Sequence, residues 1–334
     1  MTQIIKDIAP EILKEIKKAN SILLHCHPSP DPDSVGSALA TKFALEQLGK
    51  KVTIIKGDSD IPKAFVFPGV ETIVSKNYFE IDLKDFDLFI IQDTGSLQMI
   101  SALGEVIFPE HLMTIVIDHH ASNKGYAKIN CIDSTYPATG QLLFDLYSEM
   151  GINIDYKIAL NLVMGIYTDT GGFRYGGDMV ETLRVASLLS KIAPDFQKAI
   201  YHMENSNRKE SLIFEGIALS SFKTYFDDKL GIVSISHEEI VKNGFNNDDM
   251  FTGLIANKIK SIIGVEISAI LVEKEPNLVK ISIRSRDAHK FDISKLAVAL
   301  GGGGHKAAAG VKMKMTLGEA MDKLVNTTKE IYNI

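Results

Sequence analysis

The sequence of 334 residues has few cysteines, no excess of basic residues and no long apolar run, and each absence excludes a class of protein. The two cysteines, Cys26 and Cys131, cannot form a disulfide framework or a thiolate zinc cluster, and they fit a reducing compartment. With 36 Lys and Arg against 42 Asp and Glu, the net charge is -6. A protein that holds long duplex DNA usually carries a basic face, so this balance favours a short or small anionic substrate.

No apolar run approaches the roughly 20 residues that a membrane-spanning helix needs, so we expect no membrane partner. The first twenty residues place Ile5, Ile8, Ile12 and Ile16 on one helical face and lack the continuous apolar core of a signal peptide. These features predict a cytoplasmic protein. The share of hydrophobic residues, 45%, is typical of a chain with a sizeable core.

The first half of the chain alternates short β-branched runs with helical patterns. The strands expected there are Ser21–Leu24, Val52–Ile55, Leu88–Ile91 and Thr114–Ile117. A helix marked by Val35, Leu39 and Phe43 ends at Gly49, and residues 158–167 read as a buried helix. Strands without polar alternation are buried on both faces, so the pattern predicts an α/β domain around a parallel sheet.

The second half predicts a smaller, mixed α/β domain. Strands are expected at Gly231–Ser236, Glu266–Glu273 and Leu278–Arg284, and helices at Asp248–Ile263 and Asp292–Leu300. The segment from Thr316 to Glu319 is a capping box that opens a last helix. We therefore predict a first domain over residues 1–195, a helical linker over 196–225 and a second domain over 226–334.

Polar clusters follow several of these apolar elements. They are His27, Asp31 and Asp33 after the first strand, Asp93 after the third, Asp118, His119 and His120 after the fourth, and Asp169 after the buried helix. Ligands of an open parallel sheet bind at the carboxyl ends of its strands. The sequence therefore predicts that at least three of these clusters meet in one crevice.

The residue types in these clusters favour a metal site. Carboxylates with a few imidazoles suit Mn²⁺ or Mg²⁺, and five aspartates with two histidines exceed the needs of one ion. Two ions that share one carboxylate would hold a hydroxide between them for attack on a phosphorus atom. Taken singly, Asp93 and Asp169 fit ordinary turn residues and Asp33 fits an N-cap, but burying this many acids without a cation would be costly.

Four glycines in succession, Gly301 to Gly304, precede His305. One glycine suffices to end a helix, whereas several let backbone amides approach an anion closely. Arg284 and Arg286 would add cationic donors suited to phosphate, although Arg286 is equally well read as an exposed edge residue.

Together these motifs resemble the DHH/DHHA1 phosphoesterase family over nearly the whole chain. The motifs run in order as His25–Ser37, Asp93–Gly95, Asp118-His119-His120, Tyr167–Gly171 and Gly301–His305 with Ala308–Gly310. Within the family, the chain is most similar to the stand-alone bifunctional oligoribonuclease and phosphatase proteins.

The resemblance implies a role for each site residue. His27, Asp31 and Asp93 would hold one metal, and Asp93 would bridge to a second one held with Asp33, His119 and Asp169. Asp118 would orient a ligand histidine, and His120 would contact the scissile phosphate or assist the leaving oxygen. The segment with Arg284, Gly302, Gly303, Gly304 and His305 would bind the substrate in a cleft between the domains.

The implied activity is Mn²⁺-dependent hydrolysis, with Mg²⁺ as the other candidate ion. Expected substrates are short RNAs, linear dinucleotides such as 5′-phosphorylated diadenylate, and 3′-phosphoadenosine 5′-phosphate. A homodimer is a family expectation. The alternatives are a cyclic-dinucleotide phosphodiesterase, a RecJ-like single-strand exonuclease, a manganese pyrophosphatase and a nucleotide sensor that does not cut.

Overall fold

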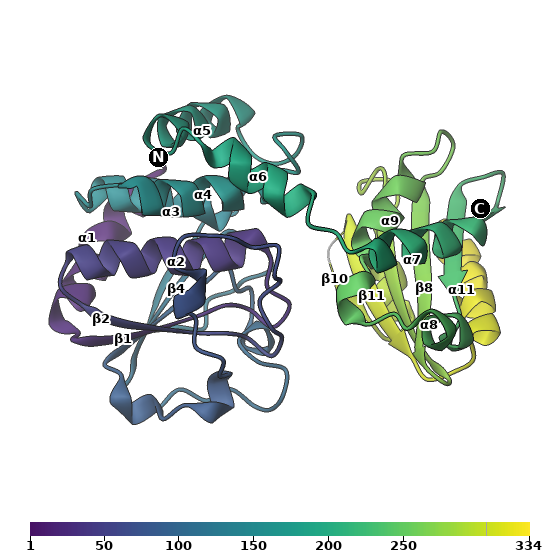
Figure 1. Ribbon diagram of the computed structural model, residues 1–334, viewed down its shortest axis with the longest axis horizontal. Helices are drawn as coiled ribbons and strands as arrows, with labels where there is room; N and C mark the ends of the chain where they lie inside the picture. Colours follow the sequence, from purple (N-terminus) through teal and green to yellow (C-terminus); the bar gives the residue numbers. More distant parts are fainter. Residues whose placement is uncertain (305) are drawn as a thin grey trace. The chain divides into compact units, whose positions relative to one another are not determined.

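The computed structural model describes residues 1–304 and 306–334. The chain forms two compact units, Met1–Ser206 and Asn207–Ile334, coloured from purple to teal and from teal to yellow in Figure 1. Within the described ranges, no helix combines the length and the apolar character needed to cross a membrane.

The first unit is built on a five-stranded sheet in the order β2-β1-β3-β4-β5, in which all paired strands are parallel. Its strands are β1 Ser21–His25, β2 Lys51–Ile55, β3 Leu88–Gln92, β4 Met113–Asp118 and β5 Ile129–Ile132. The predicted parallel α/β sheet is confirmed. The fifth strand, which has only four residues and includes Asn130, was not predicted.

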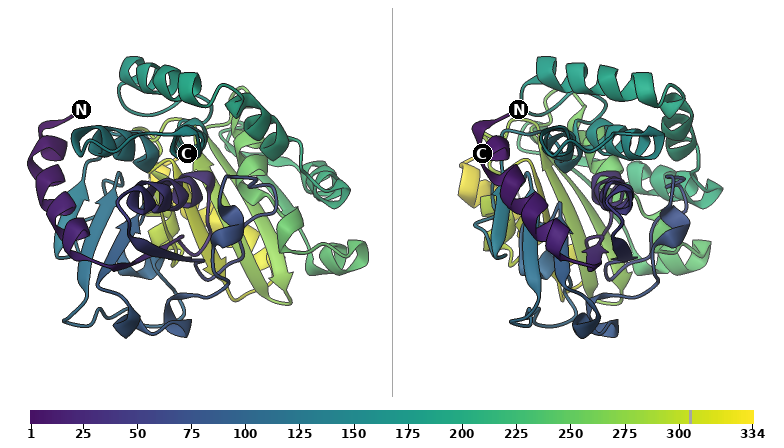
Figure 2. Two further views of the ribbon diagram at one scale, coloured as in Figure 1. Left: turned by 60° about the vertical axis from the view of Figure 1, so that its left-hand side comes forward. Right: turned by 90° about the vertical axis from the view of Figure 1, so that its left-hand side faces the viewer.

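Helices cover one face of this sheet and short turns cover the other (Figure 1). The helices are α1 Gln3–Lys18, α2 Pro32–Gln47, α3 Thr139–Glu149, α4 Tyr156–Asp169, α5 Met179–Ile192 and α6 Phe196–Glu204. The 3₁₀ turns are η1 Val70–Thr72, η2 Tyr78–Glu80, η3 Leu83–Asp85 and η4 Leu97–Met99. The views in Figure 2 show α5 outside the layer that α3 and α4 form.

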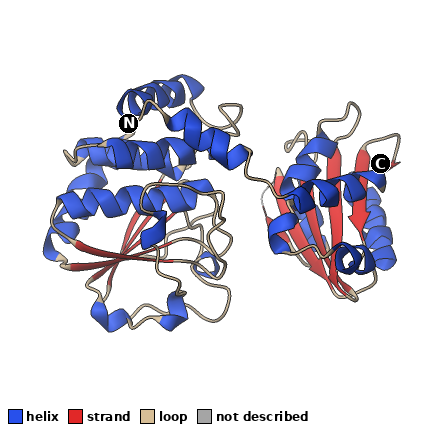
Figure 3. Ribbon diagram, in the orientation of Figure 1, coloured by secondary structure: helices blue, strands red, loops and turns tan. Residues whose placement is uncertain are grey.

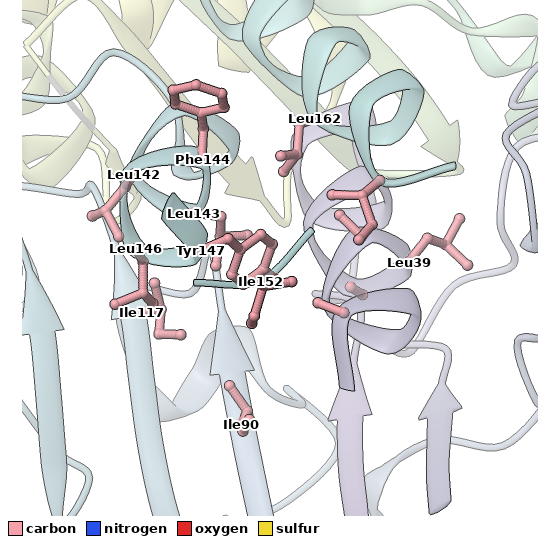
Figure 4. Packing of buried hydrophobic residues seen from close by; sticks show 14 of the residues in the cluster. Leu39, Ile90, Ile117, Leu142, Leu143, Phe144, Leu146, Tyr147, Ile152 and Leu162 are labelled. Carbon is pink, nitrogen blue, oxygen red and sulfur yellow. The ribbon is translucent and has the colours of Figure 1, made fainter. Parts of the chain in front are cut away.

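The core of the first unit lies between the sheet and the helices α2, α3 and α4. Figure 4 shows Ile90 and Ile117 of the sheet facing Leu142 and Leu146 of α3, with Leu39 of α2 nearby. These five side chains are almost completely inaccessible to solvent. Burial of apolar area at about 25 cal/mol per Å² fixes the helices against the strands, so the strand ends become a rigid platform.

The second unit contains a six-stranded mixed sheet in the order β10-β11-β9-β8-β7-β6, drawn in red in Figure 3. Its strands are β6 Lys223–Tyr225, β7 Leu230–Ile235, β8 Ile267–Glu275, β9 Leu278–Ser285, β10 Gly303–Gly304 and β11 Ala308–Met313. Only the pair β7 and β8 is parallel among these described strands, which confirms the predicted mixed sheet.

Helices pack on both faces of the second sheet. They are α7 Lys209–Ser220, α8 His237–Asn243, α9 Thr252–Lys260, α10 Ile293–Ala299 and α11 Leu317–Tyr332. The predicted capping box at Thr316 is confirmed, because its side chain accepts from Glu319 N–H and the glutamate reaches back. The helix predicted over Asp248–Ile263 is present but shorter: α9 spans Thr252–Lys260, and a separate 3₁₀ turn, η5 Asn247–Asp249, precedes it. The buried Asp249 carboxylate accepts the N–H of Asn246 at the start of this turn.

Candidate metal centre

The predicted polar clusters of the first unit lie at the carboxyl ends of its strands. His27 follows β1 by two residues, Asp93 follows β3 directly, and Asp118 is the last residue of β4. β1 and β3 are neighbours in the sheet, and the strand order reverses at this point. Ligands of open α/β sheets bind at such reversal points, so the sheet alone selects this edge for the site.

Three sets of potential ligand atoms meet at Asp93. They are His27 with Asp31 and Asp93; Asp33 with Asp93, His119 and Asp169; and Asp93 with His119 and His120; within each set the ligand atoms lie within 4.8 Å of one another. Oδ2 of Asp93 lies 3.8 Å from Nε2 of His27, and its Oδ1 lies 3.5 Å from Nε2 of His119. The two oxygens of one carboxylate therefore face two different histidines.

The backbone of Asp93 takes an unusual conformation to achieve this. Its φ is 51°, in the left-handed region that costs most residues free energy and that aspartate tolerates better than most. The Asp93 N–H donates to the carbonyl oxygen of Ile117 at 3.1 Å, which extends the pairing of β3 with β4 by one residue. The sheet thus holds the carboxylate, 2% exposed, over the strand ends.

Asp33 lies in the first turn of α2, yet its carboxylate caps a different helix. Its two oxygens accept the N–H groups of Thr139 at 2.7 Å and Gly140 at 2.9 Å, at the start of α3. The N-cap of α2 is Asp31, whose side chain accepts from Ser34 N–H, so the reading of Asp33 as the N-cap of its own helix is wrong. Burial, and then the nearby carboxylates of Asp169 and Asp93, raise the pKa of Asp33 well above its usual range.

The pKa values of His119 and Asp169 show that the cluster has an excess of negative charge. Burial alone would lower the pKa of His119, but the carboxylates of Asp169 and Asp93 outweigh it and raise that pKa to about 12. Burial, opposed by His119 and reinforced by Asp93, raises the pKa of Asp169 to about 6. A protein that crowds several acids out of water needs compensating cations.

The histidines support the same conclusion. Nε2 of His119 lies 3.3 Å from Oδ2 of Asp169, yet it makes no aligned hydrogen bond in the part of the chain described. Its other nitrogen, Nδ1, lies 3.3 Å from the carbonyl oxygen of Tyr136, which orients the ring. An imidazole held by one nitrogen with the other directed at carboxylates is the arrangement expected of a metal ligand. These residues therefore fit a divalent metal ion.

Asp118 and His120 form a pair beside the cluster. Nδ1 of His120 lies 2.7 Å from Oδ1 of Asp118, and the amide of Asn123 donates to Oδ2 of Asp118 at 2.7 Å. The resemblance implied that Asp118 orients a ligand histidine; its histidine partner in the structure is His120, which belongs to one of the potential ligand sets. Burial would lower the pKa of His120, but the bond to Asp118 and the charge of Asp93 together outweigh burial and raise that pKa.

Thr139 and Asn123 are site residues that the sequence did not indicate. The hydroxyl of Thr139 donates to Oδ1 of Asp93 at 3.1 Å, and Asn123 fixes the carboxylate of Asp118. A Thr-Gly pair is typical of a loop, and the residues before it contain no N-cap pattern. The signal that could have predicted the helix is the helical spacing of the apolar residues Leu142, Leu143 and Leu146.

The predicted substrate-binding residues lie in the second unit. Arg284 is close to the end of β9, where burial lowers the pKa of its guanidinium, and it packs against Gly253 in the first turn of α9. Gly303 and Gly304 form β10, and a side chain at Gly302 would meet the carbonyl oxygen of Gly310. His305 lies outside the described residues.

Arg286 has a structural role in this unit. Its Nη2 donates to the carbonyl oxygen of Lys260 at 2.5 Å and also to that of Ile262, at the end of α9. These bonds satisfy carbonyl groups that a helix end leaves without partners. Because its guanidinium already binds these carbonyl oxygens, Arg286 is less suited than Arg284 to bind a phosphate.

The first unit is a parallel α/β sheet with buried carboxylates and imidazoles at its strand ends, and the second is a mixed α/β unit. Two family models match these units: residues 21–166 match the DHH family, N-terminal domain, and residues 232–333 match the DHHA1 domain. Together the matches cover most of the chain. The chain belongs to the DHH/DHHA1 phosphoesterase family, hydrolases that act on phosphate esters.

Relatives with known names extend over nearly the full length. The bifunctional oligoribonuclease and PAP phosphatase NrnA of Thermus thermophilus is 28% identical over 97% of this chain and 93% of its own. The protein of the same name from Bacillus subtilis is 23% identical over 91% and 92%. The solved structure of an exopolyphosphatase-related protein from Bacteroides fragilis has a TM-score of 0.90 at 26% identity, covering 98% and 97%.

Proposed function

We propose that the protein hydrolyses phosphate esters of short oligoribonucleotides and linear dinucleotides, such as 5′-phosphorylated diadenylate, and that it also converts 3′-phosphoadenosine 5′-phosphate to AMP. The observation that carries the proposal is Asp93, whose two carboxylate oxygens face His27 on one side and His119 on the other. The names of the Thermus and Bacillus relatives support this choice of substrates.

The residues would divide between two metal ions, for which we propose Mn²⁺. His27 and Asp31 would hold one ion, Asp33, His119 and Asp169 the other, and Asp93 both. Such a pair lowers the pKa of a water molecule and neutralises phosphoryl oxygens. Oxygen and imidazole donors suit Mn²⁺ and Mg²⁺ and disfavour softer ions.

The chain's own residues then arrange the reaction. The oxygen of a water molecule would form a bond to phosphorus and lose one proton to solvent, while the bond from phosphorus to the leaving oxygen breaks and that oxygen takes up a proton. Because Nδ1 of His120 is engaged by Asp118, a proton for the leaving oxygen would come from Nε2. The raised pKa of His120 favours its protonated form, which a proton donor or a partner of a phosphoryl oxygen requires.

Arg284 would bind the substrate's terminal phosphate through its guanidinium, and Gly303 and Gly304 would approach it through backbone groups. The N–H of Gly302 already donates to the carbonyl oxygen of Ala297, so this residue would leave room for the phosphate rather than bind it. His305 stays a predicted contact. The acidic total favours short substrates over long duplex DNA. A homodimer remains a prediction that sedimentation of the full chain would test.

A kinetic panel with Mn²⁺ tests the proposal. Its substrates are 5′-phosphorylated diadenylate, an RNA of five nucleotides, 3′-phosphoadenosine 5′-phosphate, cyclic diadenylate, pyrophosphate and inorganic polyphosphate. We expect the first three to be hydrolysed most efficiently, as judged by kcat/KM. Preferential cleavage of pyrophosphate or polyphosphate would overturn the assignment, and binding of diadenylate without cleavage would indicate a sensor.

A further inference from the structure

Three lysines gather on the second sheet, on the strands β8, β9 and β11. Lys280 and Lys312 are direct cross-strand partners, so their side chains leave the sheet on the same face. Lys274 is near enough that, after burial, the charges of Lys280 and Lys312 lower its pKa. We call Lys274, Lys280 and Lys312 the lysine cluster.

Within the described part of the chain, the amines of this cluster form no close ion pairs. Among the described residues, none of the three amines has a carboxylate within 4.0 Å, although acidic residues outnumber basic ones in the chain. Lys274 instead donates to the side-chain oxygen of Asn247 at 2.7 Å. Like charges placed directly opposite each other on a sheet destabilise it, so this arrangement lowers stability unless an anion binds.

The cluster surrounds a hollow of about 470 Å³ that is also lined by Gly301, Gly302 and Gly310. One carboxylate, Glu275, lies at its wall as well. The glycines have no side chains that would fill the hollow, and the N–H groups of Gly301 and Gly302 donate to the carbonyl oxygens of Val298 and Ala297. The lysine amines are therefore the groups that would bind an anion in the hollow.

The same face of the sheet continues to Arg284. Alternation along β9 places Lys280, Ser282 and Arg284 on one face, and the partners of the latter two in β11 are Gly310 and Ala308. Two cationic positions are thus separated by a row of small residues. At the usual rise of a strand, the four residues from Lys280 to Arg284 span about 13 Å, more than one nucleotide covers.

We propose that the lysine cluster is a second phosphate subsite, which binds a backbone phosphate of a single-stranded RNA whose end is held near Arg284. This inference rests on the proposed function and narrows its substrate class. A two-nucleotide substrate is too short to use both positions, whereas an RNA of about five nucleotides reaches them. The cluster therefore favours the longer substrates.

The test compares two double variants of the full-length protein. Lys280→Gln with Lys312→Gln removes the paired charges, and Lys223→Gln with Lys323→Gln removes two exposed charges of the same unit elsewhere. Binding of a labelled five-nucleotide RNA is measured by fluorescence anisotropy in EDTA over a range of salt concentrations. Hydrolysis of that RNA and of 5′-phosphorylated diadenylate is measured with Mn²⁺.

We expect the first variant to weaken binding of the five-nucleotide RNA about tenfold and to reduce the slope of log affinity against log salt by about 0.7, since the contact with one phosphate is lost. Its KM for that RNA should rise while kcat and both constants for diadenylate stay unchanged. Equal effects of the two variants would overturn the subsite. Lysine-dependent binding of inorganic polyphosphate with no effect on RNA would overturn the choice of ligand, and lysine-dependent RNA binding without hydrolysis would refute only the proposed function.

Discussion

The hydroxyl of Thr139, the first residue of α3, donates a hydrogen bond of 3.1 Å to Oδ1 of Asp93. The same residue gives its backbone N–H to Asp33, so one residue of α3 contacts two carboxylates of the candidate metal centre. The start of this helix is therefore part of the site, although it supplies no predicted ligand. Groups that hold metal ligands commonly affect activity as strongly as some of the ligands do.

Replacing Thr139 with valine should impair the reaction without unfolding the protein. The valine keeps the shape and the backbone N–H but loses the donor to Asp93, and we expect kcat/KM to fall by about 10- to 100-fold. Thr139→Ser restores a hydroxyl and should retain most of the activity. The measurement is hydrolysis of 5′-phosphorylated diadenylate with Mn²⁺, with circular dichroism as the control for folding. Equal activity of the serine and valine variants would show that the hydroxyl is irrelevant.

Metal binding should stabilise the protein through Asp93. A ligand that binds only the folded state adds about 2.7 kcal/mol at a concentration 100 times its Kd, so Mn²⁺ should raise Tm by several degrees over the value in EDTA. Asp93→Asn tolerates the same backbone conformation but removes the shared charge, and it should abolish both the shift in Tm and turnover. A full Mn²⁺-induced shift in this variant would contradict the bridging assignment.

Much of the site was predictable because its ligands follow strands. β1, β3 and β4 are apolar runs, and an acid or histidine immediately after such a run marks the edge at which parallel strands end. The order of strands was not needed to infer that these clusters converge. The sequence does not predict which oxygen of each carboxylate faces which histidine.

The start of α3 could not be predicted, for a physical reason. Its N-cap, Ala138, has no side chain able to cap, and the caps of its first N–H groups come from Asp33, 106 residues earlier in the chain. A helix whose cap is supplied by a tertiary contact lacks a local start signal. Asp33 was interpreted as the N-cap of α2 because it lies at the start of that helix. Its carboxylate instead caps α3.

The pKa of Asp169 predicts a pH dependence that reverses when metal is added. Its folded-state pKa, about 6, lies above the ordinary 3.8, so in EDTA its contribution to stability is present below pH 3.8 and is lost as the pH rises to about 6. Asp169→Asn removes that loss and should make the metal-free variant more stable than the wild type at pH 7, by about 1 to 3 kcal/mol, with little difference at pH 4. With Mn²⁺ the order should invert, because the variant lacks a ligand. Urea unfolding in both conditions checks this, and a variant less stable in EDTA at pH 7 would contradict it.

Gly165 of α4 allows the helix to approach Asp33, and replacing it tests whether that approach sets the metal centre. A Cβ at Gly165 would lie 2.3 Å from Oδ1 of Asp33 and 3.0 Å from its Cα, so the carboxylate or the helix must move. We expect Gly165→Ala to cost about 1 to 3 kcal/mol of stability, as overpacking does, and to weaken Mn²⁺ binding measured by calorimetry.

Gly216→Ala is the matched control: this glycine lies within α7, and a Cβ there meets no atom within 4 Å. It should be neutral or stabilising by up to about 1 kcal/mol, because alanine favours the helix, and should leave Mn²⁺ binding unchanged. If Gly165→Ala lowered stability but bound Mn²⁺ as tightly as the wild type, the position of Asp33 would not control the metal site.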